Sequence, residues 1–196
     1  MRQPAPMVDQ LRAAGAIEAF LRALDLDPDS HPELRGTGAR VAQAFSEEFL
    51  RGYAVDAPAI LRANLVKADP AGAGIVVVRG IAVVTMCPHH LLPAEGTATV
   101  AFATQEFAVG LGAVVALVNA LAARLVLQET LGEEIVDAIW QAIAPRWIAC
   151  RLHLRHGCMT ARGERAHGAS VETIAERGLQ ADRDHAAAMR LLTTAP

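Results

Sequence analysis

Apolar residues recur every three or four positions in several parts of the chain, a spacing that predicts helices with one apolar face. The segments with this spacing are 7–24, 37–50, 112–126, 129–144 and 178–193. The segment 112–126 is apolar nearly all round, with Asn119 and Arg124 as its main exceptions. We therefore expect this helix to be buried.

Other segments are rich in β-branched residues or alternate apolar with polar residues, which predicts strands. They cover 75–87 (IVVVRGIAVVTMC), 97–103 (TATVAFA), 146–156 (RWIACRLHLRH) and about 169–175. If the third strand continues past residue 156, the side chain of Cys158 points to the same face of the sheet as that of His156. The order of elements predicts an α+β fold with two antiparallel hairpins that are separated by a pair of helices.

Length and composition narrow the class of protein. The 196 residues fit one domain with an N-terminal extension, and we divide the chain into a helical extension (1–36) and a main domain (37–196). The net charge of −3 argues against a nucleic-acid partner bound through a general basic surface. Charged residues or glycine interrupt each apolar run, and no secretory pattern is seen, so we expect a cytoplasmic protein without membrane contact.

The sequence Cys87-Pro88-His89-His90 carries the first chemical signal, and it lies between two expected strands. A thiolate and an imidazole three positions apart can bind one metal ion, and this pair of ligand types suits zinc. A catalytic zinc site needs a third protein ligand and keeps one position open for water. Three cysteines do not make a disulfide framework, so use of some of them on a metal is the better interpretation.

Several separated motifs resemble the GTP cyclohydrolase I family, from about Thr37 to Gly178. They are CPHHLLP with its downstream glycine, the VGLG turn, the RLVLQE segment and HGCMTARG. The resemblance implies the tunnelling fold, in which subunits with an antiparallel sheet and packed helices join their sheets into a barrel. It also implies a homo-oligomer, a decamer of two stacked pentameric rings, with each active site at a subunit interface.

The resemblance further implies a set of roles for individual residues. Cys87, His90 and Cys158 would be the ligands of Zn²⁺, which activates a water molecule. His89 and His156 would be the catalytic histidines that transfer protons at the purine ring. The alternative for either histidine is an orienting hydrogen bond.

Substrate contacts follow from the same resemblance. Gln128 and Glu129 would recognise guanine, because a carboxylate accepts hydrogen bonds from the N1–H and the 2-amino group. The other interpretation of Glu129, compatible with this one, is that it caps the following helix. Arg162 and Arg40 would contact phosphate, and Arg40 would reach the substrate of a neighbouring subunit.

Departures from the family pattern are concentrated among the phosphate contacts. A serine-lysine pair is usual where Gly112 and Ala113 stand, an arginine where Ala116 stands, and a lysine where Gln43 stands. Pro88 replaces a glutamate, with no effect that we can assign. Each lost phosphate contact costs about 1.5–3 kcal/mol. The chain is therefore identified as a divergent member with an altered phosphate pocket, which favours a substrate with fewer phosphates.

Three hypotheses about function stay open. The first is a zinc-dependent hydrolase that opens the imidazole ring of a guanine-type nucleotide or nucleoside by attack at C8, with formate and a ring-opened pyrimidine as candidate products. The second is a genuine GTP cyclohydrolase I that makes 7,8-dihydroneopterin triphosphate and binds the triphosphate through Arg151, Arg155 or Arg165. The third is a catalytically silent regulatory homologue, against which the complete set of zinc ligands and histidines argues.

Overall fold

The computed structural model describes residues 9–68, 74–179, 182 and 184–193. Its helices are α1 (Gln10–Ala23), α2 (Thr37–Ala44), α3 (Ala57–Arg62), α4 (Leu111–Ala122), α5 (Gln128–Ile143), α6 (Gly157–Thr160) and α7 (His185–Thr193). Its strands are β1 (Leu65–Lys67), β2 (Ile75–Met86), β3 (Pro93–Ala103), β4 (Phe107–Val109), β5 (Trp147–His156) and β6 (Val171–Arg177). Short 3-10 segments at Pro32–Leu34 and Arg51–Ala54 and a π-helical turn at Phe45–Phe49 complete the described elements.

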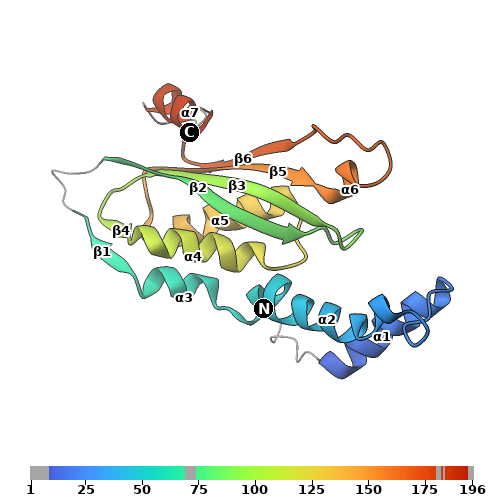
Figure 1. Cartoon of the computed structure of the whole chain (residues 1–196). Helices are drawn as coiled ribbons and strands as arrows, with labels where there is room; N and C mark the ends of the chain where they lie inside the picture. Colours follow the sequence, from blue (N-terminus) through green and yellow to red (C-terminus); the bar gives the residue numbers. More distant parts are fainter. Residues whose placement is uncertain (1–8, 69–73, 180–181, 183, 194–196) are drawn as a thin grey trace.

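A four-stranded antiparallel sheet in the order β2-β3-β5-β6 forms the centre of the fold. The two predicted hairpins are β2–β3 and β5–β6, and pairing of β3 with β5 joins them into one sheet (Figure 1). The helices α4 and α5 separate the hairpins along the chain. The predicted α+β class with an antiparallel sheet and packed helices is confirmed.

One face of the sheet carries the larger core, because α4 and α5 pack on it (Figure 1). Leu131, Ile135 and Ile139 repeat at four-residue spacing along α5, and all three are fully buried. Most of α4 is also buried, as its continuous apolar sequence predicts. The opposite face is covered near one end by α7, which buries Leu192 against Trp147 and its neighbours.

The N-terminal helices lie beside one another, away from the sheet (Figure 1). Close approach of α1 to α2 depends on Gly38, because a Cβ there would lie 2.5 Å from the carbonyl oxygen of Ala14. The proposed boundary at residue 36 falls in the turn before α2, and the division into extension and main domain stays a prediction. Among the described residues, no helix is both long enough and apolar enough to cross a membrane.

Several boundaries differ from the sequence prediction. The strand β3 begins at Pro93 instead of Thr97, and β5 ends at His156, so Cys158 does not continue its alternation. The condition under which Cys158 would share the face of His156 is therefore not met, because Cys158 lies on the single turn of α6. Residues 7 and 8 of the first predicted helix, and 180, 181 and 183 of the last, lie outside the described residues.

The contact between β3 and β5 requires a glycine at position 96. A Cβ at Gly96 would lie 2.0 Å from the carbonyl oxygen of His153, a backbone atom that cannot move by itself. We expect Gly96→Ala to lower the free energy of unfolding by about 1–3 kcal/mol, the cost of overpacking. Thermal unfolding should show a melting temperature lower by several degrees.

Gly112→Ala is the matched control, because a Cβ at this helical position meets nothing within 4 Å. This substitution should leave the melting temperature unchanged or raise it slightly, since alanine favours helix over glycine. Equal effects of the two substitutions would contradict the close approach at Gly96.

Candidate functional site

The Cys87-Pro88-His89-His90 motif forms the turn between β2 and β3, as the sequence predicts. Two backbone hydrogen bonds close the turn: the N–H of Leu91 donates to the carbonyl of Cys87 (2.9 Å), and the N–H of Cys87 donates to the carbonyl of Leu92 (2.9 Å). Leu91 has a φ of 52°, an uncommon value for a residue with a branched side chain. The turn thereby holds the thiol and the imidazole on one side of the loop.

Three ligand side chains come together at this end of the sheet. The ligand atoms of Cys87, His90 and Cys158 all lie within 4.8 Å of one another, and Cys87 Sγ is 3.8 Å from His90 Nδ1. Cys158 arrives from β5, because the pairing of Ala94 with His156 brings the end of β5 beside the start of β3. The fold thus brings Cys158 next to Cys87 and His90, although His90 and Cys158 are 68 residues apart in the chain.

A close backbone contact determines how near the turn that carries Cys158 lies to the start of β3. A Cβ at Gly157 would lie 2.9 Å from the carbonyl oxygen of Pro93. Glycine at this position lets α6 approach the beginning of β3, and Cys158 follows directly.

The electrostatics of the three side chains fit a cation. Burial raises the pKa of the Cys158 thiol, and the charge of the neighbouring Cys87 raises it further. A divalent metal ion would offset both effects, because it stabilises thiolates that are otherwise costly to hold together. Two sulfurs and one imidazole nitrogen are a ligand set that zinc accepts. The remaining cysteine, Cys150, is fully buried in the core, where burial raises its pKa to about 12.

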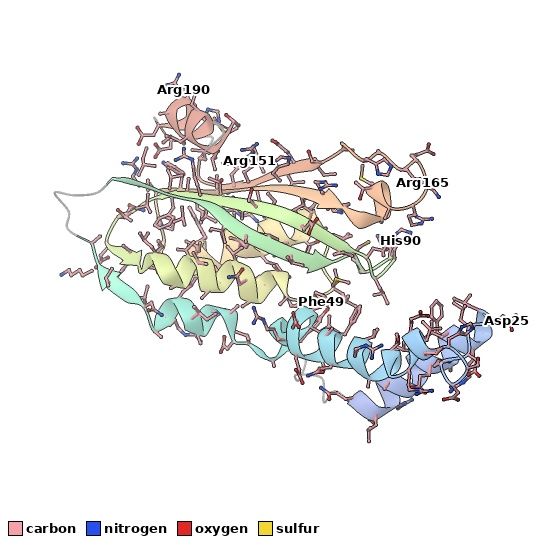
Figure 2. The ribbon with its side chains drawn as sticks, in the orientation of Figure 1. Asp25, Phe49, His90, Arg151, Arg165 and Arg190 are labelled. Carbon is pink, nitrogen blue, oxygen red and sulfur yellow. The ribbon has the colours of Figure 1, made fainter. Side chains whose placement is uncertain are left out.

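A cavity of about 160 Å³ opens beside the three ligand side chains. Most of the residues predicted to act in the site line it: Cys87, His89, Gln128, Glu129, His156 and Cys158. The side chain of His90 lies at the same end of the sheet, near the turn that carries Arg165 (Figure 2). One cavity therefore adjoins the ligand set, both predicted catalytic histidines and the predicted guanine-recognising pair.

Gln128 and Glu129 begin α5 but point into different surroundings. Gln128 is 2% exposed, and Glu129 is exposed. The Gln128 amide nitrogen donates to the carbonyls of Leu152 (3.2 Å) and Val171 (3.0 Å), and its amide oxygen lies 2.7 Å from His156 Nε2. The carboxylate of Glu129 is thus the member of the pair that is open to a ligand.

Two predicted phosphate contacts lie in different places. The Arg162 guanidinium lies 3.3 Å from His90 Nε2, which must accept because a guanidinium only donates. Arg40, on α2, donates to the carbonyl of Arg35 and the hydroxyl of Thr37 (both 3.0 Å) and does not line the cavity. The structure brings Arg162 to the site, and within a single chain it leaves Arg40 outside.

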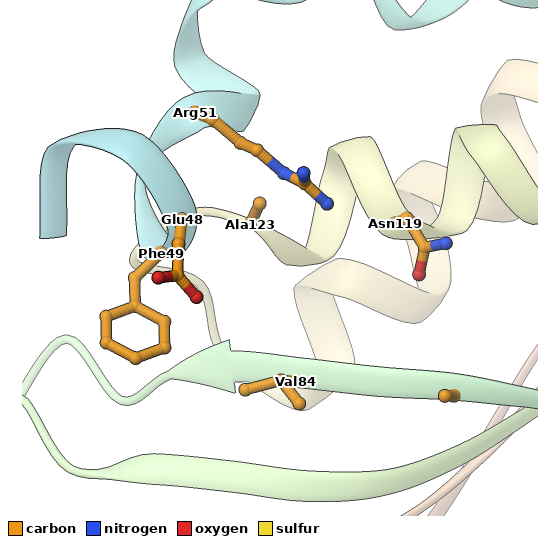
Figure 3. A pocket seen from close by; sticks show the side chains of 7 residues that line it. Glu48, Phe49, Arg51, Val84, Asn119 and Ala123 are labelled. Carbon is orange, nitrogen blue, oxygen red and sulfur yellow. The ribbon is translucent and has the colours of Figure 1, made fainter. Parts of the chain in front are cut away.

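A second cavity, of about 320 Å³, lies between the Phe45–Phe49 turn, β2 and α4 (Figure 3). Glu48, Arg51 and Asn119 are its polar lining. It contains none of the predicted site residues and no thiol or imidazole. We therefore assign the candidate site to the smaller cavity beside the cysteines.

The comparison with known proteins agrees with this assignment. A sequence model of the family described as GTP cyclohydrolase I matches residues 13–194. The match extends beyond the stretch from Thr37 to Gly178 in which the motifs were recognised. The chain therefore belongs to the GTP cyclohydrolase I family, whose members are hydrolases that act on cyclic amidines.

Individual relatives cover most of the chain. A protein of Leifsonia xyli subsp. xyli named GTP cyclohydrolase 1 is 39% identical over 170 residues, which is 87% of either chain. Proteins of the same name from Thermoanaerobacter pseudethanolicus and Mycobacteroides abscessus are 34% and 35% identical, over 88% and 94% of this chain and 90% and 88% of their own.

Among solved structures, the chain is similar to the archaeosine synthase QueF-Like in the apo form. The TM-score is 0.44 at 15% identity, over 57% of this chain and 97% of the other.

The geometry predicts which cysteines hold metal. We expect Cys158→Ala to lose most of the metal that the purified wild-type protein carries, because two remaining ligands bind far more weakly than three. Cys150→Ala is the matched control and should retain the wild-type metal content, although it will lower stability. Elemental analysis of the purified proteins measures both. Equal metal content in the two variants would remove Cys158 from the ligand set.

Proposed function

We propose that this chain is a zinc-dependent hydrolase that opens the imidazole ring of a guanine-type nucleotide or nucleoside by attack at C8. The observation that carries the proposal is the shared cavity: two thiols and an imidazole adjoin the same space as His89, His156 and Glu129. The relatives named GTP cyclohydrolase 1 support a guanine substrate and this class of reaction.

Cys87, His90 and Cys158 would hold the zinc ion. When bound, zinc supplies Lewis-acid activation of water near neutral pH. The guanidinium of Arg162 lies 3.3 Å from His90 Nε2, beside the three ligand side chains. It would be available there to an anionic group of the substrate.

His89 and His156 would move protons at the purine ring. Both line the cavity, and imidazole can donate and accept near neutral pH. Neighbouring Glu129 would recognise the base, because its exposed carboxylate can accept from both the N1–H and the 2-amino group of guanine.

The phosphate-binding side of the site supports a substrate with fewer phosphates than GTP. Gly112 and Ala116 are exposed and Ala113 is buried, and no basic residue occupies the first turn of α4. Loss of three charge-assisted contacts at about 1.5–3 kcal/mol each would weaken binding of a triphosphate severely. A monophosphate or a nucleoside does not need these contacts.

A neighbouring subunit would complete the site. The helix α4 begins at the end of the sheet away from α6 (Figure 1), so its first turn, with Gly112, lies away from the turn that carries Cys158 within one chain. Arg40 is also outside the cavity of its own chain. We therefore propose a homo-oligomer, a decamer as the resemblance implies, in which these positions face the substrate of an adjacent subunit.

The second candidate is a genuine GTP cyclohydrolase I. The names of the relatives favour it. Arg165 supports it as well, because a backbone hydrogen bond from its N–H to the carbonyl of Arg162 (3.2 Å) places the two arginines in one turn. Arg151 is a poorer candidate for a triphosphate contact, because Glu172 and the carbonyl of Leu192 already engage its guanidinium.

Steady-state kinetics on GTP, GMP and guanosine separates the two candidates. We expect kcat/KM for GMP or guanosine to equal or exceed that for GTP, with release of formate. A strong preference for GTP would return the chain to the ordinary activity of its relatives. Product mass and fluorescence show whether the reaction ends at an opened pyrimidine or continues to a fluorescent pterin.

Restoring one cation tests the phosphate argument directly. Ala116 is exposed on α4, so Ala116→Arg should fold normally. We expect this variant to raise kcat/KM for GTP relative to guanosine by roughly 10- to 100-fold, the equivalent of one charged hydrogen bond. Ala116→Gln is the control with similar length and no charge. An unchanged ratio in the arginine variant would place position 116 away from the phosphates.

The role of Glu129 predicts a change in base preference. The wild-type protein should prefer guanosine to inosine, which lacks the 2-amino group. Glu129→Gln should reduce this preference, since its amide offers one acceptor and adds a donor that faces the base. Competition kinetics with the two nucleosides measures the ratio, and Glu133→Gln, one turn further along the same helix face, is the control. An equal effect at both positions would refute recognition by Glu129.

A further inference from the structure

The buried amide of Gln128 has only one chemically acceptable orientation. Its nitrogen faces the carbonyl oxygens of Leu152 and Val171, and a carbonyl can only accept a hydrogen bond. The hydroxyl of Thr173, 3.1 Å away, lies on the same side. Rotation of the amide by half a turn would set oxygen against oxygen at a position that is 2% exposed, where unpaired polar atoms are costly.

This fixed orientation determines what His156 does at the other end of the amide. The Gln128 oxygen lies 2.7 Å from His156 Nε2, and an amide oxygen can only accept. Nε2 of His156 must therefore carry a proton. Among the described residues, no side chain or backbone group hydrogen-bonds to His156 Nδ1, and the ring lines the cavity beside the cysteines.

We propose that Gln128 is a positioning residue that holds His156 with its proton on Nε2 and presents Nδ1 to the substrate. Leu152, Val171 and Thr173 orient the amide, and the amide orients the imidazole. Nδ1 is then the atom that exchanges a proton at the cavity. This inference rests on the proposed function for the proton transfer itself, but the protonation pattern of His156 does not depend on that function.

The proposal assigns different roles to Gln128 and Glu129. The resemblance assigns both side chains to guanine recognition. Both ends of the Gln128 amide are already bonded to the protein, so the side chain has no open donor and at most one oxygen lone pair for a base. Recognition of the guanine edge then belongs to the Glu129 carboxylate, and Gln128 acts through His156.

Solid-state ¹⁵N NMR of metal-loaded protein labelled at histidine nitrogens tests the protonation pattern. His156→Ala identifies the His156 signals by their loss. At pH 8.5, where imidazoles are ordinarily neutral, wild-type His156 should show a protonated Nε2 and an unprotonated Nδ1. Gln128→Met keeps the approximate volume and removes the amide. This variant should show a second population with the proton on Nδ1.

Kinetics tests how this arrangement affects the reaction. Formate release from GTP, GMP and guanosine should show that Gln128→Met lowers kcat by on the order of 10- to 100-fold, as expected when the partner of a functional histidine is removed. KM should stay nearly unchanged, because an interaction that acts on proton transfer does not contribute to binding. A raised KM with unchanged kcat would indicate that Gln128 binds the base and would overturn the proposal.

Two further variants protect the test against general damage. Gln141→Met makes the same substitution at an exposed position of α5 and should change neither the spectrum nor kcat. If Gln128→Met does not fold, Thr173→Val removes one of the three acceptors and should shift His156 in the same direction, and Thr173→Ser should restore it. A wild-type His156 with its proton on Nδ1, or an unchanged spectrum in the folded Gln128 or Thr173→Val variant, would refute the inference.

Discussion

Antiparallel pairing of β3 with β5 is the constraint on which the site depends. It sets Ala94 opposite His156, and so it joins a loop that precedes β3 to a helical turn that follows β5. A slip of one residue would turn every side chain of β5 to the other face of the sheet, with Leu154 exposed and Arg155 in the core. The energy of the apolar core therefore holds the predicted metal ligands in register, although none of them belongs to that core.

The site combines a rigid half with an open half. Gln128 is buried between α5, β5 and β6, where its hydrogen bond to Leu152 is buried and its hydrogen bond to Val171 is partly buried. His89 and Glu129 line the cavity and, like Arg162, are exposed. Such a division suits a reaction in which proton positions must be exact and the substrate must enter and leave, because buried polar networks are ordered and exposed side chains can move.

The periodicity of the sequence predicted the four strands of the main sheet and the helices that cover it, because long runs carry a clear repeat. The elements α3, β1 and β4 were missed, since three to six residues are too short to show one. The family motifs named the residues that line the cavity. No local pattern could indicate the contacts from Gln128 to Val171 and Thr173, because only the β5–β6 hairpin brings those residues near. The turn of α6 that carries Cys158 was not predicted, because four residues are too short to show a helical repeat.

The missing side chain at Gly157 has a consequence for how this site can diverge. Because the Pro93 carbonyl occupies the place of a Cβ, the distance between the two arms of the ligand set is determined by main chain against main chain. Nearby side chains, Pro88 among them, can then be exchanged in evolution while the sulfurs keep their separation. The residues around the cavity, and with them its specificity, can therefore change as long as position 157 remains a glycine.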